Sequence, residues 1–270
     1  MRNVPPTFCG FKAMPARQAT AIVIGSFDYG ESDRIVTFFT LENGKVKGIA
    51  KGARRSWRRF SNCLDLFCHV RIHFFEKEHR SLARIDQCDP LELFPALSQD
   101  VAKMSYGSYF AELVDAMVGE GEPSRELFDL LRIFLSVLNR QEPREEMLRI
   151  FEMRLLSTLG YRPYLNACVR CQRPVDRVEK IFFAPATGGI LCETCCAPKD
   201  ELFPIAIGTI KLLERSAQTD LAKVDRLRFS ARSLTESRDI LPHFLQRHLG
   251  RPLKSVRFLE MAKLGPPGVP

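Results

Sequence analysis

Five cysteines between residues 166 and 199 are the side chains in this sequence whose type and spacing point most directly to chemistry. Two C-x2-C pairs are separated by 20 residues, and a fifth cysteine follows at once: Cys168, Cys171, Cys192, Cys195 and Cys196. Four thiolates at this spacing are typical of a tetrahedral Zn²⁺ site, with sulfur atoms about 2.3 Å from the metal. The N-terminus lacks an apolar stretch of signal-peptide length, so we expect a cytoplasmic protein whose thiols stay reduced.

The same pattern favours a structural metal over a redox or catalytic centre. A thioredoxin-like site needs one C-x2-C between a strand and a helix in a βαβ setting, and that setting is missing. A catalytic zinc keeps one position open for water, whereas four cysteines fill the coordination sphere. We therefore predict one structural Zn²⁺ per chain, held by Cys168, Cys171, Cys192 and Cys195. Two alternatives stay open: Cys196 could replace Cys195, or the cysteines could be free buried thiols.

A second group of residues, between positions 43 and 62, combines positive charge with aromatic rings and contains no acidic residue. Its cations are Lys45, Lys47, Lys51, Arg54, Arg55, Arg58 and Arg59. The three lysines would share one face of a strand, and Arg71 on the next strand would extend the positive surface. Cations bind backbone phosphates, and the ring of Trp57 could stack on a base. The alternatives are a solubility patch for the cations and burial under the loop for Trp57.

Other polar residues do not assemble into a recognisable catalytic motif. The sequence contains no P-loop, Rossmann fingerprint or nucleophile elbow. Asp28, Glu31 and Asp33 cluster in one segment, and we interpret them as solvated loop side chains. His69 and His73 are interpreted as members of an ordinary solvated strand face.

Two kinds of element must position these groups. Residues 19–87 have a hydrophobic period close to two, which predicts five strands and a small barrel. The predicted strands are 19–27, 33–40, 45–51, 68–75 and 81–88, with a type I′ turn at Asn43-Gly44. After Pro90 the period becomes 3.6, which predicts helices over 98–119, 123–139, 144–160, 207–218 and 233–250. We expect a capping box from Ser233 to Glu236 and a kink or break at Pro242.

The whole chain is therefore predicted to be of the α+β class, with strands first and helices after them. Six segments follow: a tail (1–13), a barrel (14–88), a helical part (89–165), the cysteine insert (166–200), a second helical part (201–264) and a tail (265–270). The net charge of +8 is uneven, at +8 over residues 1–85, −7 over 86–160 and +7 over 161–270. Basic blocks of this kind favour a polyanionic partner. No apolar run is long enough to predict a membrane span.

Three stretches together resemble the RecO family of bacterial DNA-repair and recombination mediators. They are "YGESDRIVTFFTLENGKVKGIAKGARR" (29–55), "FFAPATGGILCETC" (182–195) and "HLGRPLKSVRFLEM" (248–261), and the resemblance covers about residues 14–261. It implies a five-stranded OB-fold barrel followed by a helical domain with a four-cysteine zinc insert. It also implies binding and annealing of single- and double-stranded DNA. The implied protein partners are a RecR-like ring protein, the acidic tail of single-stranded DNA-binding protein and, indirectly, the RecA recombinase.

The sequence thus predicts a non-enzymatic DNA-binding protein that acts without sequence preference in repair and recombination. One rival hypothesis is a nucleic-acid-processing enzyme or RNA-binding factor that uses the barrel and the zinc module to hold its substrate. Another is a scaffold whose basic face binds an acidic protein.

Overall fold

A closed five-stranded barrel forms the N-terminal part of the computed structural model, which describes residues 16–60, 63–75 and 82–263. The strands are β1 (Ala16–Tyr29), β2 (Asp33–Thr40), β3 (Gly44–Ala50), β4 (His69–Phe75) and β5 (Ala83–Glu92). Their order around the barrel is β1-β2-β3-β5-β4, and only the β3–β5 pair among them is parallel. The predicted OB-like barrel is confirmed, while the tails predicted at 1–13 and 265–270 lie outside the described residues.

Strand β1 is long because it closes the barrel. Its first half pairs with β4 and its second half with β2, and the β2 register shifts between Val23 and Gly25. The extra residue there, Ile24, forms a β-bulge, which bends a strand and increases its twist. Small and branched residues of β1, such as Ala21 and Val23, fill the barrel interior together with side chains of the other strands.

The turn between β2 and β3 differs from the predicted type I′ turn. Thr40 pairs with Gly44, so three residues, 41–43, form the loop. Gly44 has a φ of 66°, whereas Asn43 is not among the described residues with positive φ. The Thr40 hydroxyl accepts a hydrogen bond from the Asn43 N–H and donates one to the Gly44 carbonyl. A three-residue loop closed by a left-handed glycine therefore replaces the two-residue turn.

The helical part contains seven α-helices among the described residues, besides the short α1 (Trp57–Phe60) in the basic loop. They are α2 (Pro95–Gln99), α3 (Val101–Met117), α4 (Arg125–Arg140), α5 (Glu145–Thr158), α6 (Ile207–Gln218), α7 (Ala231–Gln246) and α8 (Lys254–Lys263). Asp100 and Ser124 cap α3 and α4 by accepting hydrogen bonds from Lys103 N and Leu127 N. None of these helices is long and apolar enough to cross a membrane.

Helix α7 begins earlier than the predicted capping box. Ser230 is the capping residue and accepts a hydrogen bond from the Ser233 N–H. Glu236 is instead bonded to the Ala206 N–H, 2.9 Å away, so it ties α7 to the start of α6. Pro242 lies inside α7, which continues to Gln246 rather than breaking.

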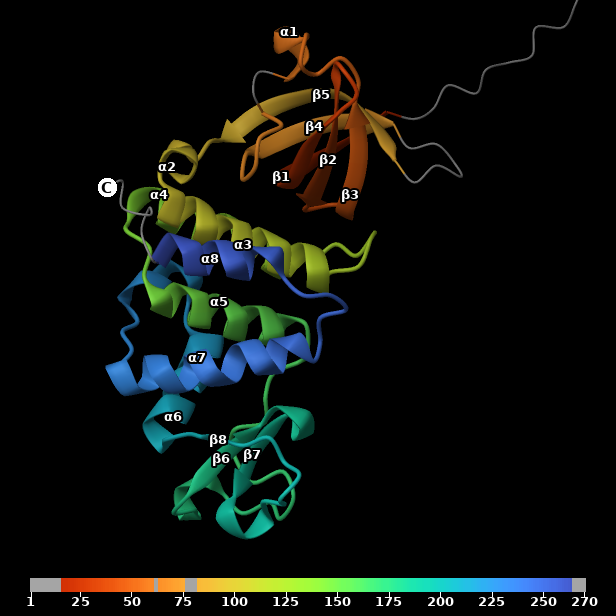
Figure 1. Ribbon diagram of the computed structural model, residues 1–270. Helices are drawn as coiled ribbons and strands as arrows, with labels where there is room; N and C mark the ends of the chain where they lie inside the picture. The colour runs from red at the N-terminus through yellow and green to blue at the C-terminus, as the bar shows by residue number, and fades with distance from the viewer. Residues whose placement is uncertain (1–15, 61–62, 76–81, 264–270) are drawn as a thin grey trace, which may run out of the picture.

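The three parts of the molecule follow one another in space (Figure 1). The barrel lies at one end, α3 and α8 lie beneath it, and α5, α7 and α6 follow. A small sheet of β6 (Ile181–Ala184), β7 (Gly189–Cys192) and β8 (Phe203–Pro204) lies at the opposite end. One hydrophobic core fills the barrel, and a second runs through the helices and includes barrel-wall residues such as Phe39 and Phe67.

Candidate metal centre and nucleic-acid interface

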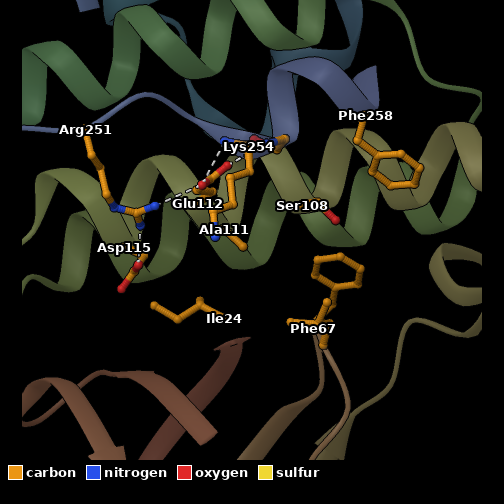
Figure 2. Close-up of a pocket in the computed structure, with 11 residues that line it drawn as sticks. Ile24, Phe67, Ser108, Ala111, Glu112, Asp115, Arg251, Lys254 and Phe258 are labelled. Carbon is orange, nitrogen blue, oxygen red and sulfur yellow. Dashed lines mark hydrogen bonds and ion pairs between the residues drawn. The ribbon is translucent and has the colours of Figure 1, made fainter. Parts of the chain in front are cut away.

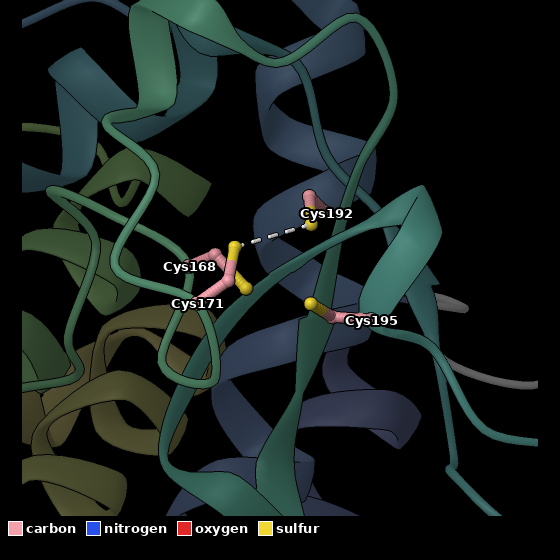
Figure 3. Close-up of side chains that lie close together, drawn as sticks. All are labelled: Cys168, Cys171, Cys192 and Cys195. Atoms are coloured by element: carbon pink, nitrogen blue, oxygen red, sulfur yellow. Dashed lines mark hydrogen bonds between the residues drawn. The ribbon is translucent and has the colours of Figure 1, made fainter.

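The four cysteines predicted as metal ligands come together beside the small sheet. The Sγ atoms of Cys168, Cys171, Cys192 and Cys195 all lie within 4.8 Å of one another (Figure 3). The Sγ atoms of Cys171 and Cys192 are 3.7 Å apart. A tetrahedral ion with ligands at 2.3 Å requires sulfur atoms about 3.8 Å apart, so this donor set fits a soft metal ion such as Zn²⁺.

The first C-x2-C pair sits in a tight turn whose backbone N–H groups point at sulfur. The turn is closed by bonds from Cys168 N to the Arg173 carbonyl and from Gln172 N to the Cys168 carbonyl, and Gln172 has a φ of 58°. Burial acts to raise the pKa of Cys168, but the N–H groups of Cys171, Cys192 and Arg170 outweigh it and lower that pKa to about 6. These N–H groups, two from the turn and one from Cys192 of β7, therefore favour the thiolate of Cys168, which is the form that binds metal.

The second pair, on the turn after β7, is held by residues outside it. Arg170 donates hydrogen bonds to the Cys195 carbonyl and to Asp200, which in turn accepts a bond from the Ala197 N–H. The Cys196 thiol instead lies 3.4 Å from the Cys192 carbonyl, and Cys196 does not belong to the cluster. Cys195, and not Cys196, therefore belongs to the group of thiols that could hold a metal ion.

The segment before the first cysteine pair packs against the start of β7 and leaves no room for a side chain at Gly189. A Cβ there would lie 2.5 Å from the Tyr164 carbonyl oxygen. Strand β7, which carries Cys192 at its end, pairs with β6 in an antiparallel hairpin.

The predicted basic residues do not all lie on one free surface. On β3, Lys45, Lys47 and then Lys51 point outward, as predicted. Lys45, however, donates a 2.7 Å hydrogen bond to the Asp115 carbonyl at the end of α3, and its side chain is only 15% exposed. Lys45 therefore joins the barrel to the helices, while Lys47 and Lys51 are exposed.

The basic loop after β3 is fixed against the β1–β2 turn. The Gly52 N–H donates to Asp33 Oδ1 at 2.8 Å, and this bond lowers the pKa of Asp33. Arg59 donates to the Lys51 carbonyl at 2.8 Å, and its guanidinium lies 5.0 Å from the centroid of the Phe60 ring. Arg59 consequently holds the loop rather than projecting from it.

The remaining loop arginines are exposed, although two of them have acidic neighbours. Arg54 lies 3.8 Å from Asp28 and Arg55 lies 3.9 Å from Glu31. Exposed pairs of this kind contribute only about 0–1 kcal/mol, so a phosphate can compete for these arginines. The exposed cations of this end of the barrel are Lys47, Lys51, Arg54, Arg55 and Arg58.

Two further predicted contributors have different outcomes. Arg71 is exposed on β4, which pairs with β1 and β5 and is not next to β3, the strand that leads into the basic loop. The structure therefore does not bring Arg71 together with the basic loop. The side chain of Trp57 lies outside the part of the chain that the structure describes, so its stacking or burial stays a prediction.

The structure also brings two aromatic residues to the basic end of the barrel that the sequence reading missed. Phe27 and Tyr29 are 52% and 55% exposed and lie on the outer face near the end of β1. The strand predicted over 19–27 does not include Tyr29, whereas β1 continues to it. The alternation of two large rings, at positions 27 and 29, just before a glycine turn is the sequence pattern that indicates this extension.

His69 differs from its interpretation as part of a solvated face. Its side chain is 13% exposed, its ring packs edge-on against Phe128 of α4, and Nδ1 lies 3.6 Å from Glu92. Burial lowers the pKa of His69. The N-terminal end of β4 is thus covered by the helical part, whereas His73 farther along remains near the surface.

A pocket of about 420 Å³ lies between the barrel, α3 and α8 (Figure 2). Ile24, Phe67 and Phe258 form apolar walls, and Lys254 lies at its edge. Arg251 there is paired with Glu112 and Asp115, at 3.1 and 2.8 Å.

Comparison with known proteins covers nearly the whole chain. A family model described as "Recombination protein O N terminal" matches residues 14–94, and one described as "Recombination protein O C terminal" matches residues 98–257. The first match spans the barrel, and the second spans the helices and the cysteine cluster.

Curated relatives are similar over the same length. The "DNA repair protein RecO" of Syntrophus aciditrophicus is 37% identical over 248 residues, covering 90% of this chain and 95% of the relative. That of Anaeromyxobacter dehalogenans is 38% identical over 247 residues, covering 92% and 96%. That of Pelotomaculum thermopropionicum is 34% identical over 255 residues, covering 94% and 98%. With both halves matched in order and the barrel, helices and cysteine cluster in place, the chain belongs to the RecO family.

Proposed function

We propose that this protein is a non-enzymatic mediator of DNA repair and recombination that binds single- and double-stranded DNA without sequence preference. The observation that carries the proposal is the group of exposed cations on β3 and the following loop. Figure 1 places α1, and with it this loop, at the end of the barrel away from the helices. Lysine and arginine there can neutralise backbone phosphates, which carry no sequence information.

Annealing of complementary strands follows from the same surface. Two strands repel each other through their phosphates, and a shared basic surface screens that repulsion. The rival assignment, a nucleic-acid-processing enzyme or RNA-binding factor, is less well supported. Asp28 and Asp33, two of the three acids beside the basic loop, contact Arg34, Arg54 and the Gly52 N–H and so hold the loop in place.

Zinc is proposed as a structural cofactor, one ion per chain. Cys168, Cys171, Cys192 and Cys195 would hold it, and it would supply the cross-link between the two turns. The residues around it, Arg170 and Asp200, would keep the second turn in place.

Partner proteins are proposed from the family: a RecR-like ring protein, the acidic tail of single-stranded DNA-binding protein and, indirectly, the RecA recombinase. For the acidic tail, the pocket beside α8 is our candidate surface, because apolar walls adjoin the cationic Lys254. We propose that the protein acts in the cytoplasm, close to the nucleoid.

Strand annealing tests the central proposal. We expect the protein to accelerate annealing of complementary strands, including strands coated with single-stranded DNA-binding protein. Turnover of DNA into cleaved or modified products, without annealing, would favour the enzyme hypothesis instead.

Charge reversal locates the surface. We expect Lys47→Glu/Lys51→Glu to weaken binding strongly and to reduce the slope of log affinity against log salt by about 1.4 for single strands, since each phosphate contact contributes about 0.7. The matched control is Lys211→Glu/Lys223→Glu, which makes the same charge change at two exposed lysines of the second helical part. Equal effects of the two double variants would place the interface elsewhere.

A further inference from the structure

The two exposed rings at the end of β1 form a pattern with the lysines of β3. Single exposed apolar residues are ordinary on protein surfaces. Phe27 and Tyr29, however, are two residues apart on one strand, so both side chains leave it on the same outer face, from Cα positions about 6.8 Å apart. Both are more than half exposed. Two large rings are therefore presented to solvent on one face of β1.

The strand register shows what lies beside them. Phe27 pairs with Ile35, and Ile35 pairs with Ile49 of β3, so these three form one row across the sheet. The preceding row runs from Gly25 through Thr37 to Lys47.

The row after it contains the second ring. Tyr29 pairs with Asp33, and the charge of Lys51, the residue after β3, acts on Asp33. The apolar row thus lies between the row that ends in the exposed Lys47 and the Tyr29–Asp33 pair. The Asp33 carboxylate accepts a hydrogen bond from the N–H of Gly52, the residue after the exposed Lys51. Two strand spacings, about 10 Å, separate β1 from β3, which a lysine side chain partly bridges.

We propose that Phe27 and Tyr29 stack on the bases of a single-stranded nucleic acid whose phosphates contact Lys47 and Lys51. This inference rests on the proposed nucleic-acid binding by the barrel and adds the basis for distinguishing unpaired from paired strands. Every base has a π-face, so stacking is independent of sequence, but in a duplex those faces are covered by neighbouring base pairs. The lysines contact phosphates of both single- and double-stranded DNA, whereas the rings stack only on the bases of single strands.

The charge around the rings agrees with a nucleic-acid occupant. Asp28, between the two rings in sequence, points toward Arg34 and Arg54, at 3.5 and 3.8 Å. No ion pair of Lys47 or Lys51 is found within the described residues. Glu31, the exposed acid of the same turn, lies 3.9 Å from Arg55. The acids beside the rings thus face arginines while Lys47 and Lys51 do not, which suits a polyanion and opposes binding of a basic partner.

Leucine and tryptophan substitutions in the full-length protein test the proposal. Phe27→Leu and Tyr29→Leu keep an apolar cover over Ile35 but remove the π-face, whereas Phe27→Trp retains it. Equilibrium binding is measured by fluorescence anisotropy with labelled oligothymidylate and with a DNA duplex of equal length. We expect each leucine variant to raise the Kd for oligothymidylate about five-fold or more, with the duplex Kd unchanged within about two-fold. Phe27→Trp should bind as tightly as the unmodified protein.

Two controls separate stacking from charge and from loss of fold. Tyr161→Leu removes a comparably exposed ring, 46% exposed, just after α5 and should change neither Kd. The salt slope should stay constant in the leucine variants, because they remove no phosphate contact. Unchanged oligothymidylate affinity in Phe27→Leu/Tyr29→Leu, or equal weakening for duplex, overturns the stacking role while leaving the proposed function intact. Failure of the unmodified protein to bind either DNA would instead refute the proposed function.

Discussion

At the scale of single residues, three lysines on and just after β3 differ in function because they differ in what they contact. Lys45, Lys47 and Lys51 share a residue type and a direction, and the sequence gives no reason to separate them. Lys45 meets the carbonyl end of α3, where helix dipoles favour a cation. The other two meet solvent. Only the position of α3 against the barrel distinguishes a structural lysine from a candidate phosphate ligand.

Whether Cys195 or its neighbour Cys196 binds the metal can be tested by substituting each in turn. We expect Cys195→Ser to abolish binding of one zinc per chain, because it removes a member of the cluster. Cys196→Ser should keep the metal, since that thiol lies against the Cys192 carbonyl instead. Elemental analysis of the purified variants measures this directly. Loss of zinc from Cys196→Ser but not from Cys195→Ser would reverse the assignment of the ligand.

At the scale of elements, a buried polar network joins three helices. Glu152 of α5 accepts a 2.6 Å hydrogen bond from the Tyr109 hydroxyl of α3 and lies 3.0 Å from Arg149. Arg149 also reaches the Ser237 carbonyl of α7. All three side chains of the network, those of Tyr109, Arg149 and Glu152, are buried. Because such charges are costly to bury unless paired, the network fixes how α3, α5 and α7 pack.

Breaking one side of this network should destabilise the fold strongly. We expect Arg149→Leu to lower the free energy of unfolding by about 3–5 kcal/mol, because it leaves the Glu152 carboxylate buried without its cation. The double variant Arg149→Leu/Glu152→Leu should recover part of that loss, since it removes both charges. Urea unfolding followed by circular dichroism measures both. A double variant less stable than Arg149→Leu would contradict this account.

The contact of the barrel with α4 adds a pH-dependent term to stability. His69 faces Phe128, Glu92 and, through Glu92, Arg132. Burial is the main cause that lowers the pKa of His69, and Glu92 acts in the opposite direction. Below its ordinary pKa of about 6.5, the unfolded chain binds a proton that the folded protein does not. Stability is therefore lost as the pH falls from about 6.5 to the lowered folded pKa, and it levels off below that.

Comparison with His69→Gln isolates this term from other titrating groups. Between pH 7 and pH 5 the unmodified protein should lose more free energy of unfolding than the variant, which has no proton to gain at this position. Urea midpoints at several pH values provide the measurement. Parallel pH profiles for the two proteins would exclude His69 as the source.

Local patterns predicted the elements better than their connections. The strands and most helices follow from hydrophobic period, which reports the buried face of each element. The Asn43-Gly44 turn and the Ser233 cap were wrong because neighbouring polar residues, Thr40 and Ser230, provide competing hydrogen bonds. Helix α8 was not predicted; its start is fixed by Glu112 of α3, which accepts bonds from Lys254 N and Ser255 N. Such distant partners leave no local trace in the sequence.

The two candidate sites likewise differ in how far the sequence could predict them. The spacing of the two C-x2-C pairs is enough to predict that four thiols come together, so each residue of the metal cluster could be named from the sequence. The nucleic-acid surface could be predicted only as a region, since Lys45 and Arg59 are bonded to backbone carbonyls and Arg71 lies on β4, away from the basic loop. A role for the rings of Phe27 and Tyr29 could be inferred only from the strand register, which places them near Lys47 and Lys51.

At the scale of the whole molecule, charge and shape act together. The acidic middle of the chain, residues 86–160 with a net charge of −7, forms α2 to α5, which include the helices directly beneath the barrel. A polyanion is repelled from that side and attracted to the basic loop at the far end. The cysteine cluster lies at the opposite end of the helices from the barrel (Figure 1).

This separation predicts that metal and single-strand binding are independent. Removing zinc with a chelator, or by Cys168→Ser, should loosen residues 166–200 and make them sensitive to limited proteolysis. The Kd for oligothymidylate should change less than about two-fold, because the barrel contacts α3 and α4 through residues such as Lys45 and His69, at the opposite end of the helices from the cysteine cluster. Lys47→Glu/Lys51→Glu, by contrast, should weaken binding with zinc content unchanged. A large loss of single-strand affinity in the zinc-free protein would mean that the cysteine module itself contacts nucleic acid.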